Sequence, residues 1–319
     1  MSDKRSRIDL AVTRQDDHTN LVEPSFSGIL SFARRRYTKC LDGVDVAVVG
    51  LPFDLATTSR PGARLGPRAI REASAMIAWD RLHGWEYDPF ERVCVVDFGD
   101  IPVAQGNPER LPDDIHAAFA EIHGAGVKTL MLGGDHFATY PVLKSVAAHY
   151  DEPLSLVHFD AHSDTWAEDQ QTLDHGTMFY HAAKQGLIDP SRSIQVGIRT
   201  HNPETHGFHV LTAEQTDAMG ADSVVQFILE KTRGNNVYLT LDIDCLDPAF
   251  APGTGTPVVG GLSTMALQRI LRGLRGVPIA AADVVEVAPA YDHAQITALA
   301  GATLAMSMIG LLADCETPE

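Results

Sequence analysis

Seven short apolar runs recur along the chain, and each is long enough to form one buried strand. They are Val44–Val49, Val93–Val96, Lys128–Leu132, Leu154–Phe159, Ser193–Val196, Val237–Leu241 and Pro278–Val285. Hydrophobic residues follow one another in these runs instead of alternating with polar ones, which is typical of strands buried on both faces of a parallel sheet. The pattern therefore predicts a central, mainly parallel sheet.

Segments with helical features separate the predicted strands. They are Pro67–Ile77, Pro112–His123, Pro141–Ala148, Ala221–Lys231, Thr264–Leu274 and Gln295–Leu312. Strands that alternate with helices, without a repeat or a low-complexity linker, predict a single three-layer α/β/α domain. We expect residues 43–319 to form this domain. Residues 1–42 show no sustained periodicity and are expected to form an N-terminal arm or surface segment.

Three of the apolar runs end in aspartate and histidine residues. These are Asp135 and His136 after the third run, Asp160, His162 and Asp164 after the fourth, and Asp242 and Asp244 after the sixth. Because the carboxyl ends of parallel strands meet at one edge of a sheet, we expect the three groups to converge there. Buried carboxylates and imidazoles are unfavourable unless something neutralises them. The pattern therefore favours a cluster of metal ions.

Strand geometry predicts how these side chains would point. If the chain stays extended, a period of two residues places Asp160, His162 and Asp164 on one side and does the same for Asp242 and Asp244. Cys245 would then point the other way, which makes its sulfur a poor candidate ligand.

The charges of this group fit two divalent cations. Four negative charges come from Asp160, Asp164, Asp242 and Asp244, and two neutral imidazoles from His136 and His162. Crowded carboxylates cannot all stay ionised without compensation, and two divalent ions would balance them. Two ions about 3.5–4 Å apart can also lower the pKa of a bridging water to near neutrality. Oxygen and imidazole ligands suit manganese first, with magnesium, iron, cobalt or nickel as alternatives, and they do not exclude zinc.

Bulk composition narrows the classes of partner. The formal net charge of −17 over 319 residues disfavours nucleic acid and anionic membranes as partners, and would attract cationic solutes. We find no apolar stretch in the sequence of the roughly 18 to 20 residues that a membrane span requires. Four scattered cysteines without a CxxC pair fit reduced thiols in the cytoplasm better than disulfides.

Five longer motifs point to a known family. They are GGDHF at 133–137, FDAHSDT at 159–165, DHGTMF at 174–179, DIDCLDPAFAPGTGTP at 242–257 and DVVEVAP at 283–289. In this order the motifs resemble the ureohydrolase family of arginases and agmatinases, and within it the bacterial agmatinases most closely. The match extends from about Val49 to the last predicted helix.

The resemblance implies an arginase-like fold and the hydrolysis of a guanidine to urea and an amine over two manganese ions per subunit. By position in the motifs, His136 and Asp164 would bind one ion, His162 and Asp244 the other, and Asp160 and Asp242 both. A hydroxide that bridges the ions would attack the guanidinium carbon. His175 matches the family's proton-shuttling histidine, and Glu286 matches its guanidinium-binding glutamate. A homo-oligomer, trimer or hexamer, is also implied.

Which guanidine is hydrolysed is a separate question. The family's arginine-specific pattern is incomplete here, because the residues that follow Arg199 are not acidic. Acidic residues at Glu168, Asp169 and Asp174 would repel a substrate carboxylate and tolerate an ammonium group. We therefore expect a small cationic guanidine, with agmatine first and guanidinobutyrate or another guanidino acid as the alternative. Phosphoester hydrolysis and a metal-bound scaffold without turnover are the rival classes.

Overall fold

The computed structural model describes residues 25–78, 81–103, 106–167 and 172–314. Its centre is an eight-stranded sheet in the order β2-β1-β3-β8-β7-β4-β5-β6. The strands are β1 Val46–Leu51, β2 Val95–Asp100, β3 Lys128–Gly133, β4 Ser155–Phe159, β5 Ile194–Ile198, β6 His209–Thr212, β7 Val237–Asp242 and β8 Ile279–Val285. Every neighbouring pair in this sheet is parallel, which confirms the predicted sheet.

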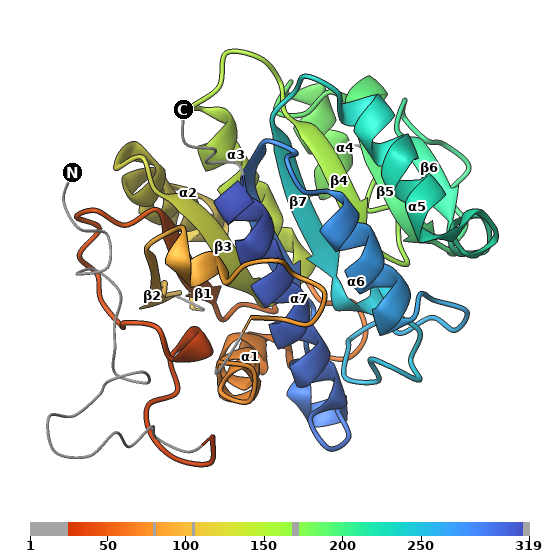
Figure 1. The fold of residues 1–319 in the computed structure, drawn as a ribbon. Helices are drawn as coiled ribbons and strands as arrows, with labels where there is room; N and C mark the ends of the chain where they lie inside the picture. Colours follow the sequence, from red (N-terminus) through yellow and green to blue (C-terminus); the bar gives the residue numbers. More distant parts are fainter. Residues whose placement is uncertain (1–24, 79–80, 104–105, 168–171, 315–319) are drawn as a thin grey trace, which may run out of the picture.

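Helices cover both faces of the sheet (Figure 1). The helices are α1 Gly66–Ser74, α2 Leu111–Gly124, α3 Thr139–Ala147, α4 Met178–Lys184, α5 Ala213–Thr232, α6 Thr264–Gly273 and α7 Ile296–Asp314. Helices α1, α5, α6 and α7 pack on one face, and α2, α3 and α4 pack on the other. The three-layer α/β/α architecture is therefore confirmed.

The strands are apolar along their whole length because helices cover both faces of the sheet. In β1, Val46 and Val48 pack into the core under α1 and α7, whereas Ala47, Val49 and Leu51 pack into the core under α2 and α3. Each side of the strand meets a helix layer, so neither side needs polar residues.

Three elements were missed or truncated by the sequence pattern. β6 is a four-residue edge strand that is only half buried, so it lacks a continuous apolar run. α4 is short and lies inside the DHGTMF motif. α5 begins eight residues before the predicted start at Ala221, because a capping box at Thr212 and Gln215 starts a first segment that ends in a kink at Gly220.

Helix α7 corrects one expectation from the sequence. Its 19 residues are long and apolar enough to cross a membrane by length and composition alone. In this structure most of the helix is buried, and it contacts α1, α6, β3 and β8. Burial between helices and a sheet accounts for the apolar composition of α7.

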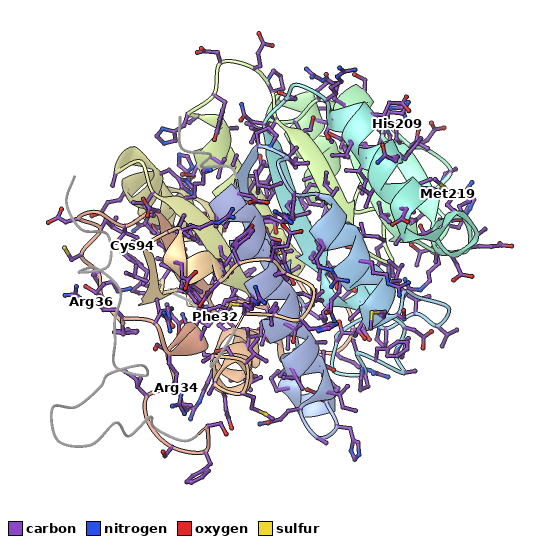
Figure 2. All side chains as sticks on the ribbon, in the orientation of Figure 1. Phe32, Arg34, Arg36, Cys94, His209 and Met219 are labelled. Atoms are coloured by element: carbon purple, nitrogen blue, oxygen red, sulfur yellow. The ribbon has the colours of Figure 1, made fainter. Side chains whose placement is uncertain are left out.

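Part of the predicted N-terminal arm lies among the described residues. A short 3-10 helix at Phe32–Arg34 packs beside α1, and Figure 2 labels Phe32 and Arg34 there. The Phe32 N–H donates to Asp97 Oδ2 (2.7 Å), and Arg71 of α1 donates to the same oxygen (2.8 Å). The segment is thus attached to the main body through a buried carboxylate. The division of the chain at residues 42 and 43 remains a prediction.

Candidate metal centre and active site

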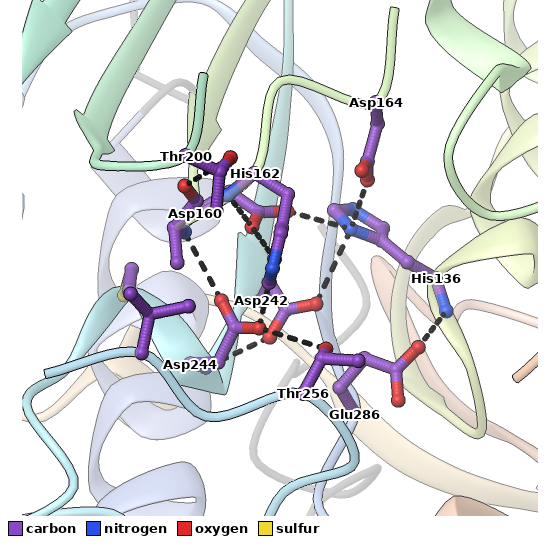
Figure 3. Close-up of polar contacts among 12 residues, drawn as sticks. His136, Asp160, His162, Asp164, Thr200, Asp242, Asp244, Thr256 and Glu286 are labelled. Atoms are coloured by element: carbon purple, nitrogen blue, oxygen red, sulfur yellow. Dashed lines mark hydrogen bonds and ion pairs between the residues drawn. The ribbon is translucent and has the colours of Figure 1, made fainter. Parts of the chain in front are cut away.

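The acidic and histidine residues predicted from the sequence meet at the carboxyl ends of four strands, β3, β8, β7 and β4, which are neighbours in the sheet. His136 follows β3, Glu286 follows β8, Asp242 and Asp244 follow or end β7, and Asp160, His162 and Asp164 follow β4. Figure 3 shows these side chains pointing toward one another. The convergence agrees with the general position of sites in parallel sheets.

A first group of ligand atoms surrounds His136. Its Nδ1 lies 3.0 Å from Asp160 Oδ2, 3.0 Å from Asp164 Oδ2 and 3.5 Å from Asp242 Oδ2. The four side chains are buried, and Nδ1 makes no aligned hydrogen bond within the described part of the chain. A ring nitrogen that faces several carboxylate oxygens in this way fits a cation held between them.

A second group surrounds His162. Its Nδ1 lies 3.1 Å from Asp244 Oδ2 and 3.3 Å from Asp160 Oδ1. Asp160 therefore presents one carboxylate oxygen to each group. The Thr256 hydroxyl donates to Asp244 Oδ2 at 3.2 Å (Figure 3). By the mutual distances of their ligand atoms, His136, His158, Asp160 and Asp164 form one group and Asp160, His162 and Asp244 the other, so the two groups share Asp160 and together form one candidate site for two cations.

Tight turns, and not an extended chain, aim these carboxylates. After β7 the chain enters a 3-10 turn at Ile243–Cys245, and Asp242 Oδ1 accepts the Asp244 N–H at 2.7 Å. After β4, Asp160 Oδ1 accepts the His162 N–H at 2.6 Å. Asp164 then adopts a left-handed backbone with φ of 52°. The chain does not stay extended after β4 and β7, so the condition for the predicted side-chain directions is not met; Cys245 nevertheless lies outside both groups.

The electrostatics of the cluster call for added positive charge. Burial, with Asp244 and Asp160 nearby, raises the pKa of Asp242 well above its usual value. Burial and Asp160 raise the pKa of Asp244 to about 6. Burial lowers the pKa of His162, but hydrogen bonds to Asp160 and Asp244 outweigh it and raise this pKa to about 12. Asp242 and Asp244, which resist ionisation, and His162, which attracts a proton, fit a pair of bound cations beside them.

Glu286 and His175 lie beside the first group. Glu286 Oε1 accepts the His136 N–H (2.9 Å) and lies 3.4 Å from His175 Nδ1, whereas Oε2 is buried without a hydrogen-bond partner among the described residues. Burial lowers the pKa of His175, but Glu286 and nearby carboxylates raise it to about 9. The backbone of Glu286 is left-handed, with φ of 63°. Within the described residues, one oxygen of the Glu286 carboxylate is thus left to accept a further hydrogen bond.

A cavity of about 320 Å³ opens onto these groups. Its lining residues are Thr58, His136, His162, Asp164, Trp166, Asp174, His175, Gly176, Thr177, Asp242 and Thr256. Two larger cavities, of about 490 and 610 Å³, contain none of the six residues proposed to bind metal. Of the acidic residues expected to select the substrate, Asp174 lines the smaller cavity, and Glu168 and Asp169 lie outside the described residues.

Sequence reasoning missed several buried polar residues around the site. Gln195, His158, Thr240 and Asp283 each lie in a strand and are fully buried. Asp135, which the sequence pattern grouped with His136 but gave no role, is also buried next to Glu286, and its Oδ2 accepts the Ala56 N–H at 2.8 Å. In three of the predicted runs, a lone acidic, amide or imidazole side chain among apolar neighbours was the available signal. Such residues are costly to bury unless they serve a hydrogen-bond network.

Comparison with known proteins places the chain in a family. The sequence profile of the Arginase family matches residues 44–310. The agmatinase of Chromobacterium violaceum is 48% identical over 313 residues, which are 98% of this chain and 97% of that protein.

Solved structures agree. The crystal structure of a hypothetical agmatinase from Burkholderia thailandensis has a TM-score of 0.91 and 50% identity, covering 96% of this chain and 97% of that one. A proclavaminate amidino hydrolase from Streptomyces clavuligerus has a TM-score of 0.86 and 36% identity, covering 92% and 100%. Profile, relatives and fold together extend over nearly the whole described chain, and the chain therefore belongs to the arginase family of ureohydrolases.

Proposed function

We propose that this chain hydrolyses agmatine to putrescine and urea, with two manganese ions per subunit as its cofactor. The observation that carries the proposal is a buried Glu286 oxygen that has no hydrogen-bond partner among the described residues and lies beside the first of two candidate cation-binding groups, which share Asp160. Relatives named agmatinase, at about half identity over most of the chain, support this choice of substrate.

The ligand atoms divide between two ions as the family resemblance implies. His136 and Asp164 would hold one ion, His162 and Asp244 the other, and Asp160 would contact both through its separate oxygens. The sharing of Asp242 rests on the resemblance, because its closest contact to a histidine is on the His136 side. When bound, such an ion pair supplies a water that loses its proton near neutral pH.

Glu286 would hold the guanidinium group of the substrate. A planar guanidinium presents paired N–H donors to a carboxylate, and this fixes the position of its central carbon. Glu286 Oε2 has no partner among the described residues, and Oε1 is already fixed by the His136 N–H. The carboxylate is thus preorganised before the substrate arrives.

His175 would supply the proton that the leaving amine needs. Its Nδ1 lies within 3.4 Å of Glu286 Oε1, and its Nε2 within 3.3 Å of Thr58 Oγ1. Against the effect of burial, Glu286 and nearby carboxylates raise the pKa of His175, and an imidazole in hydrogen-bond reach of the substrate can act as a general acid near neutral pH. Its place in the cavity wall brings it to the substrate side of the cluster.

The charge of the cavity favours an amine over a carboxylate at the far end of the substrate. Asp174 lines the cavity beside Trp166, and the chain carries a formal charge of −17. A carboxylate at this end would meet like charge, whereas an ammonium group would not. Guanidinobutyrate and other guanidino acids are the alternative substrates, and one structural relative is named as an amidino hydrolase of proclavaminate.

The direct test is urea release from a panel of guanidines. Purified protein loaded with manganese is incubated with agmatine, arginine and guanidinobutyrate, and the kcat/KM of each is compared. We expect agmatine to be preferred. Turnover of guanidinobutyrate without turnover of agmatine would reject agmatine as the substrate, but it would agree with the proposed hydrolysis of a guanidine to urea.

Two other results would reject the chemistry itself. Bound metal without urea from any guanidine would favour a scaffold, and hydrolysis of ordinary phosphoesters would favour a phosphoesterase. The resemblance also leads us to propose a cytoplasmic homo-oligomer, trimer or hexamer, which a measurement of molar mass in solution would test.

A further inference from the structure

A row of buried polar side chains crosses the sheet just behind the metal cluster. Gln195 of β5 pairs in register with His158 of β4, His158 pairs with Thr240 of β7, and Thr240 pairs with Asp283 of β8. All four residues are fully buried. Most of their neighbours in these strands are apolar, so a row of four buried polar residues needs a reason beyond packing.

The row contacts the first metal group through Thr240. His136 Nε2 lies 2.8 Å from Thr240 Oγ1, and the Thr240 hydroxyl donates to Asp283 Oδ1 at 2.6 Å. The other oxygen of Asp283 accepts the hydroxyls of Tyr238 (2.8 Å) and Thr139 (2.9 Å). Burial raises the pKa of Asp283 above its usual value, and His136 and the three hydroxyl donors offset only part of that rise.

The hydrogen bonds from His136 through Thr240 to Asp283 indicate which ring nitrogen of His136 carries the proton. A threonine hydroxyl has one proton, and here Thr240 donates it to Asp283. Thr240 Oγ1 can then only accept a hydrogen bond from the ring, so Nε2 must carry the proton. The lone pair is left on Nδ1, the atom that faces Asp160, Asp164 and Asp242.

We propose that Thr240 and Asp283 are positioning residues that hold His136 in the Nε2–H tautomer and aim its Nδ1 lone pair at the metal ion. The reverse tautomer would place a proton between Nδ1 and the carboxylates and oppose metal binding. Metal-bound histidines generally donate their second N–H to such a partner, and losing that partner weakens metal binding tenfold to a hundredfold. The inference rests on the metal centre proposed above.

The main test compares two buried threonines that each contact a histidine ring. Thr240→Val keeps the size of the side chain and removes the hydroxyl. Thr129→Val is the matched control, because Thr129 is equally buried in β3 and its Oγ1 lies 3.0 Å from Nε2 of His123, which is outside the cluster. The dissociation constant for Mn²⁺ is measured from the electron paramagnetic resonance of free Mn²⁺.

We expect Thr240→Val to weaken Mn²⁺ binding by about tenfold to a hundredfold. Thr129→Val should leave binding within about threefold, and Thr240→Ser, which restores a hydroxyl, should recover most of the affinity. Equal affinity in the two valine variants would overturn the inference. Absence of Mn²⁺ binding by the unmodified chain would overturn the metal centre itself, and the inference with it.

A second measurement reads the tautomer directly in the unmodified protein, and a variant serves only to assign the resonances. Protein with ¹⁵N-labelled histidine is loaded with ¹¹³Cd²⁺, and His136→Asn identifies the resonances of His136. We expect a coupling between ¹¹³Cd and Nδ1, with a proton on Nε2. A coupling to Nε2, or a proton on Nδ1, would overturn the assignment of the tautomer.

Discussion

Asp160 presents its two carboxylate oxygens to different histidines, one 3.0 Å from His136 and the other 3.3 Å from His162. A third imidazole, His158, lies 2.8 Å from the first of these oxygens. Gln195 Nε2 is 3.2 Å from His158 Nδ1, so His158 is oriented to donate from Nε2. At the residue scale, chemically similar groups thus have distinct tasks according to the atoms they face.

The residue scale gives a prediction that separates metal binding from proton transfer. His136→Ala and Asp242→Asn should lose bound metal and urea formation together, because each removes a ligand from a crowded acidic cluster. His175→Ala should keep its metal and lower kcat by about 10²- to 10⁴-fold, the usual contribution of a general acid or base. Metal content by mass spectrometry and urea release are measured on the same samples.

Two outcomes of these measurements would contradict the proposed role of His175 in proton transfer. If His175→Ala loses its metal, the side chain belongs to the metal centre and not to proton transfer. Unchanged kcat with metal retained would leave the proton donor to another residue of the cavity.

At the element scale, the turn after β3 places His136 by close contact between backbones. Gly134 donates its N–H to Leu51 O (2.8 Å), and Asp135 donates to Phe53 O (2.7 Å). A Cβ at Gly134 would lie 1.6 Å from Phe53 O and 2.5 Å from the carbonyl carbon. Only glycine allows the segment after β1 to come this close.

Gly134→Ala is therefore expected to move the backbone that carries His136. We predict a loss of unfolding free energy of at least about 1–3 kcal/mol, together with weaker Mn²⁺ binding. Denaturation by urea and a metal titration measure the two effects.

Gly124→Ala is the matched control. Gly124 ends α2, and a Cβ there would meet no atom within 4 Å. This variant should be neutral or more stable by about 0.4–1 kcal/mol. If both variants lost the same unfolding free energy, close packing at Gly134 would not be the cause of the destabilisation.

Sequence reasoning succeeded for elements with strong patterns and failed where the pattern was weak. The seven apolar runs became seven strands, because both faces of each strand are covered by helices. The edge strand β6 was missed because it is half buried, and the first half of α5 because Gly220 interrupts it. The convergence of the acidic residues followed from parallel topology, but tight turns after β4 and β7 decide how they point.

The buried polar row behind the site could not be predicted in the same way. Thr240 and Asp283 become partners only when β7 and β8 pair in a particular register. Both faces of these strands are buried, so their continuous apolar pattern does not indicate which residues of β7 and β8 pair. Their roles therefore appear only in three dimensions.

At the scale of the whole molecule, the polar groups at the carboxyl ends of the strands differ from those at the amino ends. The metal cluster lies at the carboxyl ends of the strands, whereas His123 lies near the amino end of β3. Its Nδ1 is 2.8 Å from Ser145 Oγ, and its Nε2 is 3.0 Å from Thr129 Oγ1. Burial, with His149 and His116 nearby, lowers the pKa of His123 from 6.5 to about 4.

This shift predicts a loss of stability in acid that begins far from the active site. Between pH 6.5 and about 4 the unfolded chain binds a proton at His123 that the folded chain does not, so stability falls as the pH falls. The difference in unfolding free energy between the unmodified protein and His123→Gln should therefore shrink by up to about 3 kcal/mol as the pH falls through this range. Urea denaturation in EDTA at several pH values measures it, and a constant advantage would contradict the prediction.

Asp164 and Glu286 hold their carboxylates on backbones with φ of 52° and 63°. Glycine adopts such angles without steric penalty, so each of these residues is retained at a conformational cost of order 1 kcal/mol. Selection for thermostability alone would favour glycine at both positions. Variants collected that way should tolerate more heat and hydrolyse nothing, because robustness and turnover compete for the same two residues.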